Sequence, residues 1–335
     1  MFRTVPSIES SFPNEICSWW DSAAMSMEQG DPFCCGSIWQ LTFHEVMGPP
    51  DRRLLFSADG GDMLAFAESF SPSGTALITP IESGWFYGSP LLGRGAVRMF
   101  RELLPHIREE MPSLPPIAIG AVEPGHLTAH LLFRYFEKDF NFFRASRTEP
   151  CAASLLGGYD GFLANRSSNF RCKLKKAFRR AKERGLTFIE PPLSSDAEAD
   201  DAFGRVLEVE KKSWKGLSGC GIDTEPYSAF YASMLRRLAR AGDARLLFAE
   251  ADGRDIGYIF GGVMGPHYRG QQFSFDSDWR AYSVGDLLQA EQVRRLCGEG
   301  ILFYHMGSKT GERMGYKEHW TELTFPIETW IMKQK

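Results

Sequence analysis

The sequence predicts a mixed α/β protein, and the order of elements in its second half carries that prediction. Apolar residues recur there first at helical spacing, then in short runs bounded by turn residues such as Asp252-Gly253. The expected elements are, in order, helices at 197–214 and 226–241, strands at 244–251, 255–264 and 268–275, a helix at 285–297, and strands at 301–305 and 321–332. A meander followed by a strand–helix–strand crossover is typical of a mixed sheet covered by helices.

The first half is expected to contain more strands and turns. Strands are predicted at 38–43, 53–57, 63–68, 76–80, 117–120 and 135–144, a helix at 97–111, and a short helical segment at 126–133. The chain has 335 residues, and domains average about 150 residues. We therefore expect two α/β halves, 1–150 and 151–335.

Composition excludes several classes of protein. The net charge of −4 argues against a protein that coats DNA, and 43% apolar residues argue against disorder. No apolar stretch is long enough to insert into a membrane. Seven cysteines without a C-x-x-C pair predict no disulfide framework and a cytoplasmic location. His126 and His130 have helical spacing but no third ligand nearby, so we expect no metal site.

A strongly basic helix is predicted at 166–184, at the start of the second half. It carries nine basic residues and one acid: Arg166, Arg171, Lys173, Lys175, Lys176, Arg179, Arg180, Lys182 and Arg184 against Glu183. Its apolar residues recur at helical spacing, so the helix is amphipathic. Two interpretations stay open, namely a solvated face and a contact with an anionic partner.

The segment from Phe273 to Leu288 is the most informative for chemistry. A strand leads into a polar loop, and the loop leads into a helix whose first N–H groups and positive dipole end suit a phosphate. In this loop Arg280 supplies a cation. The small residues Ser283 and Gly285 would let the backbone approach a pyrophosphate closely.

This segment resembles the acyl-CoA pyrophosphate loop of the GNAT acetyltransferase superfamily, R/Q-x-x-G-x-G/A, with Ser283 in place of the first glycine. Further motifs resemble CelD-like acetyltransferases, which are associated with cellulose biosynthesis and related to the FemAB peptidoglycan aminoacyltransferases. These motifs, collinear over residues 160–325, are the basic run from Asn169, the segment Glu210-Lys-Lys-Ser-Trp214-Lys-Gly, Phe275-Asp276, and Tyr316-Lys317-x-x-Trp320.

The resemblance implies a tandem GNAT-like fold of two mixed-sheet units with flanking helices. The N-terminal unit is then a degenerate copy, and the C-terminal unit carries the acyl-CoA loop. The implied reaction moves an acyl group, expected to be acetyl, from acyl-CoA to an amine by direct attack, with no metal. The implied acceptor is an amino sugar, a polysaccharide precursor or an amino-acid-like molecule.

Two alternatives remain open at this point. One is a FemAB-like transferase that uses aminoacyl-tRNA, and the other is a non-catalytic GNAT-like scaffold in envelope polysaccharide biosynthesis. The basic helix 166–184 would meet a carrier protein, a tRNA or the CoA phosphates.

Candidate site residues follow from the resemblance, which implies that the strands at 268–275 and 301–305 splay apart around the donor. The expected donor-binding residues are Phe273, Ser274, Phe275, Arg280, Tyr282, Ser283, Val284, Gly285 and Asp286. Asp276 or His305 is the candidate base, Tyr316 the acid for the leaving thiolate, and Lys317 a ligand for phosphate or an acceptor carboxylate. Glu210 and Trp214 are expected to border the acceptor. Each has a structural alternative: a loop cap for Asp276, core or surface packing for His305, and packing or solvated charge for the others.

Overall fold

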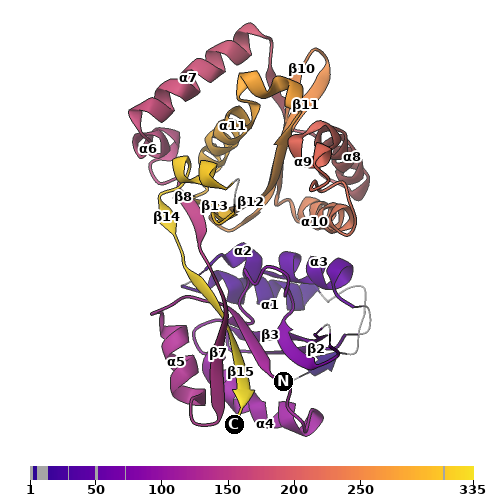
Figure 1. The fold of residues 1–335 in the computed structure, drawn as a ribbon, viewed down its shortest axis with the longest axis vertical. Coiled ribbons are helices and arrows are strands. Elements are labelled where there is room, and N and C mark those ends of the chain that lie inside the picture. Colours follow the sequence, from indigo (N-terminus) through magenta and orange to yellow (C-terminus); the bar gives the residue numbers. More distant parts are fainter. Residues whose placement is uncertain (1–2, 6–13, 29, 50–51, 72, 312–313) are drawn as a thin grey trace. The chain divides into compact units, whose positions relative to one another are not determined.

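The computed structural model describes the chain except residues 1–2, 6–13, 29, 50–51, 72 and 312–313, and it divides into two compact units (Figure 1). Unit 1 comprises residues 1–149 and 325–335, and unit 2 comprises residues 150–324. Each unit is built on one mixed sheet.

The sheet of unit 2 has seven strands in the order β14-β8-β13-β12-β11-β10-β9. In chain order they are β8 (Pro150–Ser154), β9 (Thr187–Ile189), β10 (Ala244–Ala251), β11 (Arg254–Met264), β12 (His267–Phe275), β13 (Phe303–Ser308) and β14 (Leu323–Thr324).

Helices cover both faces of this sheet. One face carries α6 (Gly158–Ala164), α7 (Ser168–Glu183) and α11 (Val284–Gly298), and the other carries α8 (Asp196–Lys212), α9 (Trp214–Leu217) and α10 (Tyr227–Ala241). Helix α11 is the centre of the first layer, because Leu287, Leu288, Val293 and Leu296 are all fully buried. Two 3₁₀ helices, η1 (Ser277–Tyr282) and η2 (Gly315–His319), follow β12 and β13.

The main path of the unit 1 sheet runs β1-β2-β3-β4-β6-β15-β7, with β5 paired to β3. Its strands are β1 (Arg3–Val5), β2 (Leu54–Asp59), β3 (Asp62–Phe70), β4 (Ala76–Pro80), β5 (Leu91–Leu92), β6 (Ile117–Val122), β7 (Phe140–Thr148) and β15 (Ile327–Gln334). Its helices are α1 (Asn14–Met25), α2 (Pro32–Cys35), α3 (Ser37–Met47), α4 (Ala96–Glu110) and α5 (Leu127–Phe136).

The two units repeat one topology. In unit 1 an antiparallel meander β2-β3-β4 leads through α4 to β6, which is parallel to β4. In unit 2 the meander β10-β11-β12 leads through α11 to β13, which is parallel to β12. One further strand is inserted in each sheet from a distant part of the chain: the C-terminal β15 lies between β6 and β7, and β8, which precedes the meander of unit 2, lies between β13 and β14. The expected fold class, a tandem of mixed α/β units, is confirmed.

The boundary after residue 149 lies next to the expected one, but the C-terminus differs from the expectation. The single strand predicted at 321–332 is two short strands, β14 in unit 2 and β15 in unit 1. Pro326 lies between them, and proline cannot donate a ladder hydrogen bond. The chain therefore leaves one sheet at this point and enters the other.

The strand predicted at 38–43 was wrong, because this segment lies within helix α3. Trp39, Leu41 and Phe43 are buried, and so are the polar residues between them. The carboxylate of Asp21 on α1 accepts hydrogen bonds from Ser37 N at 2.7 Å and from Ser37 Oγ at 3.0 Å, which ties the start of the helix to α1. Helices α1 and α6 and strand β8 had not been predicted.

Candidate functional site

A gap opens in the unit 2 sheet between strands β12 and β13. The two strands pair in parallel at three positions and stop after Arg269 and His305, although β12 continues to Phe275. A Cβ atom at Gly270 would lie 2.7 Å from the Tyr304 ring. Glycine therefore lets the Tyr304 ring pack against β12 at the point where the strands part.

The free edge of β12 presents the backbone of Phe273 and Phe275 to this gap. Asp276 N donates to Ile256 O on β11 at 2.8 Å, and successive residues of an antiparallel strand turn their N–H groups to opposite sides. The backbone groups of Phe273 and Phe275 consequently point away from β11, towards the side from which β13 has departed.

The loop after β12 sets the start of α11. Ser283, at the N-cap, has φ 57° and ψ 41°, a left-handed conformation that is unusual for a residue other than glycine. A glycine in the corresponding GNAT position would adopt it without strain. Arg280 in this loop is exposed, and Tyr282 is half-buried.

Gly285 has a packing role that the sequence analysis had not foreseen. A Cβ atom there would lie 3.2 Å from the rings of both Phe273 and Phe275. Val284 beside it is fully buried, and the Trp320 side chain hydrogen-bonds Asp286 in the same turn. The first turn of α11 is thus held directly against the last residues of β12. Ser274 lies on the opposite face of this strand, where it is buried and pairs with Tyr258 of β11.

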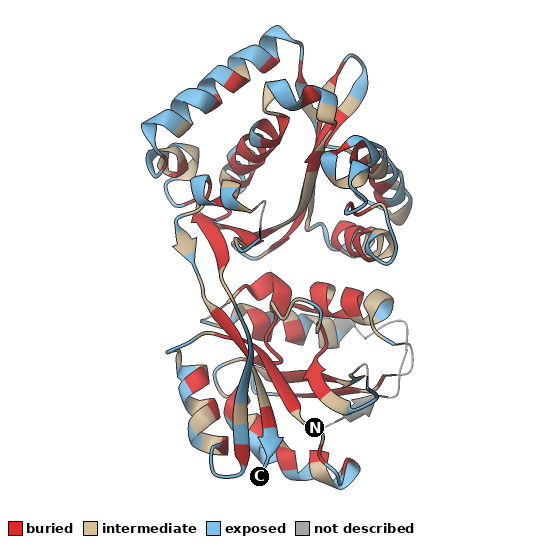
Figure 2. Cartoon of the chain, in the orientation of Figure 1, coloured by how far each residue is buried: buried red, intermediate tan, exposed pale blue. Residues whose placement is uncertain are grey.

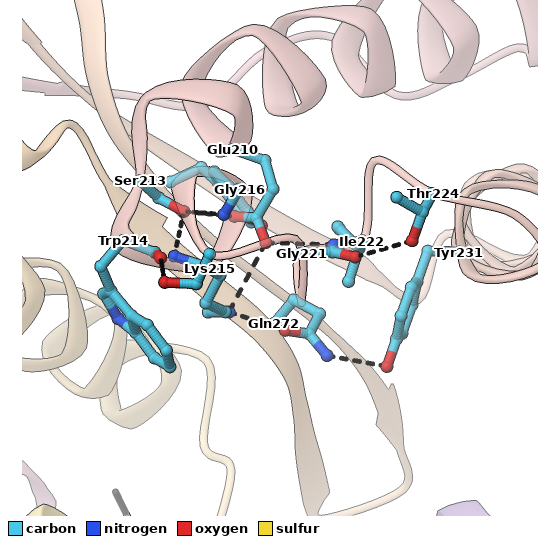
Figure 3. Close-up of polar contacts among 12 residues, drawn as sticks. Glu210, Ser213, Trp214, Lys215, Gly216, Gly221, Ile222, Thr224, Tyr231 and Gln272 are labelled. Carbon is cyan, nitrogen blue, oxygen red and sulfur yellow. Dashed lines mark hydrogen bonds and ion pairs between the residues drawn. The ribbon is translucent and has the colours of Figure 1, made fainter.

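Glu210, at the end of α8, is the centre of a buried polar network (Figure 3). Its side chain is fully buried and accepts hydrogen bonds from the Tyr258 hydroxyl at 2.9 Å and from Ile222 N at 3.2 Å. Ser213 Oγ lies 3.4 Å from the same carboxylate and accepts from the first N–H groups of α9. Glu210 therefore fixes both α9 and the loop at 218–224.

Lys215 extends this network to β12, a connection that the sequence analysis missed. Its ammonium donates to Gln272 Oε1 at 2.9 Å and lies 3.9 Å from Glu210 Oε1, and Gln272 Nε2 donates to the Tyr231 hydroxyl at 2.8 Å. Burial lowers the pKa of Lys215, while the Glu210 charge opposes that shift. The signal was available in the sequence, since Lys215 lies inside the segment from Glu210 to Gly216 that carried the resemblance.

Tyr316 and Lys317, on η2, join the same region through Phe273. The Tyr316 ring meets Phe273 edge to face at 5.6 Å, and the Lys215 ammonium lies 5.9 Å from the centre of the Phe273 ring. Burial raises the pKa of Tyr316, so its hydroxyl keeps its proton. Lys317 is 7% exposed and donates to Ser308 O at 2.6 Å. Burial lowers its pKa to about 8, with a smaller contribution from the charges of Arg269 and Lys215 in the same direction.

Asp276 and His305 have other contacts. Asp276 Oδ1 accepts from Asp278 N at 3.0 Å and caps η1, which is the structural alternative for this residue. His305, at the last paired position of the two strands, is buried, and its Nε2 lies 3.0 Å from Nδ1 of His267, which is at the first. The catalytic roles expected of both residues remain predictions.

The predicted site residues therefore form one group and several outliers. Phe273 contacts both the Tyr316 ring and the Lys215 ammonium, and Lys215 in turn lies beside Glu210. Lys317 follows Tyr316 on η2. Trp214 is 38% exposed.

In unit 1 the corresponding place beside the parallel strands is occupied by the chain itself. Strands β4 and β6 pair at one position, and the segment after β4 folds back so that Gly88 O and the Phe86 ring lie 3.1 Å and 3.3 Å from where a Cβ of Gly120 on β6 would be. The Glu82 carboxylate, fully buried, holds this segment by accepting from three successive backbone N–H groups. The two sheets share a topology, but this region of unit 1 is filled.

Within the described residues, no three His, Cys, Asp or Glu side chains gather as metal ligands. No helix in the described part of the chain is long and apolar enough to cross a membrane.

Comparison with known proteins agrees with this geometry. The family model of the acetyltransferase (GNAT) domain matches residues 168–318, which lie wholly in unit 2. No curated protein sequence matches the chain.

Three solved structures share the fold at low sequence identity. FemX superposes with a TM-score of 0.70 at 11% identity, covering 99% of this chain and 97% of FemX. A conserved protein of unknown function from Bacteroides thetaiotaomicron gives 0.62 at 11% identity, covering 95% and 97%. L-PGS from Bacillus licheniformis gives 0.55 at 14% identity, covering 92% and 94%. Residues 168–318 are therefore similar to the acetyltransferase (GNAT) domain, and the chain shares its fold with these three structures.

Proposed function

We propose that unit 2 transfers an acyl group, acetyl in the simplest case, from acyl-CoA to an amine. The observation that carries this proposal is the gap between β12 and β13, which adjoins the first turn of α11. An extended pantetheine arm would pair with the free edge of β12, and the pyrophosphate would meet the N-terminal N–H groups of α11.

The residues around the gap supply what such a transfer needs. The amine nitrogen attacks the thioester carbon, and an N–H from the Phe273–Phe275 edge stabilises the oxyanion. As the C–S bond breaks, the Tyr316 hydroxyl gives its proton to the sulfur; its raised pKa keeps this hydroxyl protonated before that step. Lys317, with a pKa of about 8, takes the proton that the amine loses.

The acceptor follows from the CelD-like resemblance, which points to an amino sugar, a polysaccharide precursor or an amino-acid-like molecule. Glu210 contributes indirectly, because it positions Lys215 and the loop at 218–224 on the same side of the sheet.

The first test is calorimetric binding of CoA and acetyl-CoA, followed by release of free CoA thiol in the presence of a panel of amines. We expect both ligands to bind and an amine-dependent release of thiol. Tyr316→Phe, which removes one hydroxyl, should lower kcat by about 10²-fold or more and leave the Kd for CoA unchanged.

Two results would redirect the proposal. A protein that ignores CoA but accepts the aminoacyl group of an aminoacyl-tRNA would be a FemAB-like transferase. A protein that binds neither donor would act as a non-catalytic scaffold.

A further inference from the structure

The basic helix α7 has two distinct charged sides. With 100° between successive residues, Lys173, Lys176 and Arg180 fall within a sector of about 60°, whereas Lys175 and Lys182 lie on the far side of the helix. All five residues are exposed, as is most of α7 (Figure 2). We call Lys173, Lys176 and Arg180 the inner stripe.

The inner stripe borders the loop and helix that follow β12. The Arg180 guanidinium lies 5.6 Å from the centre of the Tyr282 ring in η1. Lys173 lies close enough to Asp286, in the first turn of α11, to act on it electrostatically. Below the stripe, Ala177 and Ala181 of α7 pack in one cluster with Trp279, Val284 and Leu287, so this arrangement is fixed by the core of unit 2.

The neighbouring cation Arg184 is already paired with a carboxylate, whereas Lys176 and Arg180 of the inner stripe are not. Arg184 forms a bidentate pair with Asp252 and lies over the Trp279 ring at 5.0 Å. Among the described residues, no carboxylate forms an ion pair with Lys176 or Arg180. Helix α7 therefore directs uncompensated positive charge towards the start of α11. The gap in the sheet lies at the other end of the loop that joins β12 to α11.

We propose that the inner stripe binds the 3′-phosphate of CoA, so that α7 is a specificity element for CoA over donors without that group. The inference rests on the proposed function, which places the pyrophosphate at the first turn of α11. A phosphate monoester carries close to two negative charges at neutral pH, and the next phosphate beyond the pyrophosphate in CoA is the one on the adenosine ribose. Lysine and arginine side chains that are mobile and exposed suit such a solvent-facing group.

The experiment compares CoA with 3′-dephospho-CoA by calorimetry, in the full-length protein and two double variants. The test variant is K173Q/R180Q, and the matched control is K175Q/K182Q, which removes the same charge from the opposite side of α7. The wild-type protein should prefer CoA to 3′-dephospho-CoA by about tenfold or more, the size expected of one charge-assisted phosphate contact. The test variant should bind both ligands with the affinity that the wild type has for 3′-dephospho-CoA, and the control should behave as wild type.

The possible results separate the two proposals. If the test variant lost the same factor in affinity for both ligands, the inner stripe would contact the pyrophosphate, which both ligands share, and the inference would be overturned. An unchanged preference in the test variant would overturn it as well, and so would a wild type without any preference. Failure of the wild type to bind either ligand would instead refute the acyl-CoA proposal itself, and steep, salt-dependent tRNA binding lost in K173Q/R180Q would assign the stripe to RNA.

Discussion

Lys317 offers a quantitative test of the electrostatics around the gap. Its pKa of about 8 in the folded protein compares with 10.5 for an ordinary lysine. Between these two values the unfolded chain binds a proton that the folded protein does not, so the free energy of unfolding rises with pH. The slope approaches about 1.4 kcal/mol per pH unit, and the whole difference amounts to about 3 kcal/mol.

The perturbation is Lys317→Met, which keeps the length of the side chain and removes the titrating amine. The variant leaves Ser308 O without its donor, a penalty of about 1–3 kcal/mol that does not depend on pH. The informative quantity is therefore the change with pH of the difference in unfolding free energy between wild type and variant. We expect this difference to grow in favour of the wild type by about 2–3 kcal/mol from about pH 8 to about pH 10.

Urea denaturation followed by tryptophan fluorescence at a series of pH values measures this difference. The groups that act on Lys317 are Cys151, Arg269 and Lys215, and they are present in both proteins. Lys182→Met, at an exposed position, is the matched control for the loss of a lysine side chain. A flat difference for Lys317→Met across the same range would show that the amine titrates normally, and it would remove Lys317 as the proposed base.

Three further predictions concern single positions in unit 2. Ser283→Gly should keep the unfolding free energy and the CoA affinity near wild type. Ser283→Val should lower the unfolding free energy by about 1–3 kcal/mol, because a β-branched residue fits a φ of 57° poorly. Equal unfolding free energies of the two variants in urea denaturation would contradict this. Glu210→Ala should lower the unfolding free energy by about 1–3 kcal/mol for each donor left unpaired, among them the Tyr258 hydroxyl and Ile222 N. The same variant should expose the loop at 218–224 to limited proteolysis. Protease resistance equal to that of the wild type would count against the network. Gly204→Ala, inside α8 with no atom near its added Cβ, should raise the unfolding free energy by about 1 kcal/mol, and a loss of stability would reveal a packing constraint that the structure does not contain.

Local sequence patterns were sufficient for much of unit 2. The meander and the crossover were predicted from apolar runs bounded by turn residues, and the basic helix from apolar residues at helical spacing. The loop between β12 and α11 was also found in the sequence, since a strand, a polar turn and a helix follow one another without interruption. The predicted residues Glu210, Tyr316 and Lys317 came from the resemblance, and the structure places them in one region.

The rest depended on contacts between residues that are distant in the chain. The helix at Ser37–Met47 was mistaken for a strand, because burial on several sides hides the period of the apolar residues. Lys215 meets Gln272 across 57 residues, and no local pattern indicates such a pairing. The insertion of the C-terminal strand β15 between β6 and β7 likewise joins residues that are about 200 positions apart in the chain.

The sequence alone determined the class of fold, the order of the main elements from α8 to β13 and the loop that resembles a phosphate-binding site, since these are properties of contiguous residues. Only the tertiary structure decided that the strands part after Arg269 and that the equivalent region of unit 1 is filled by its own chain. It also decided that the lowered pKa of Lys317 arises from burial. Those features depend on packing and on the exclusion of water, which arise only when distant segments are brought together.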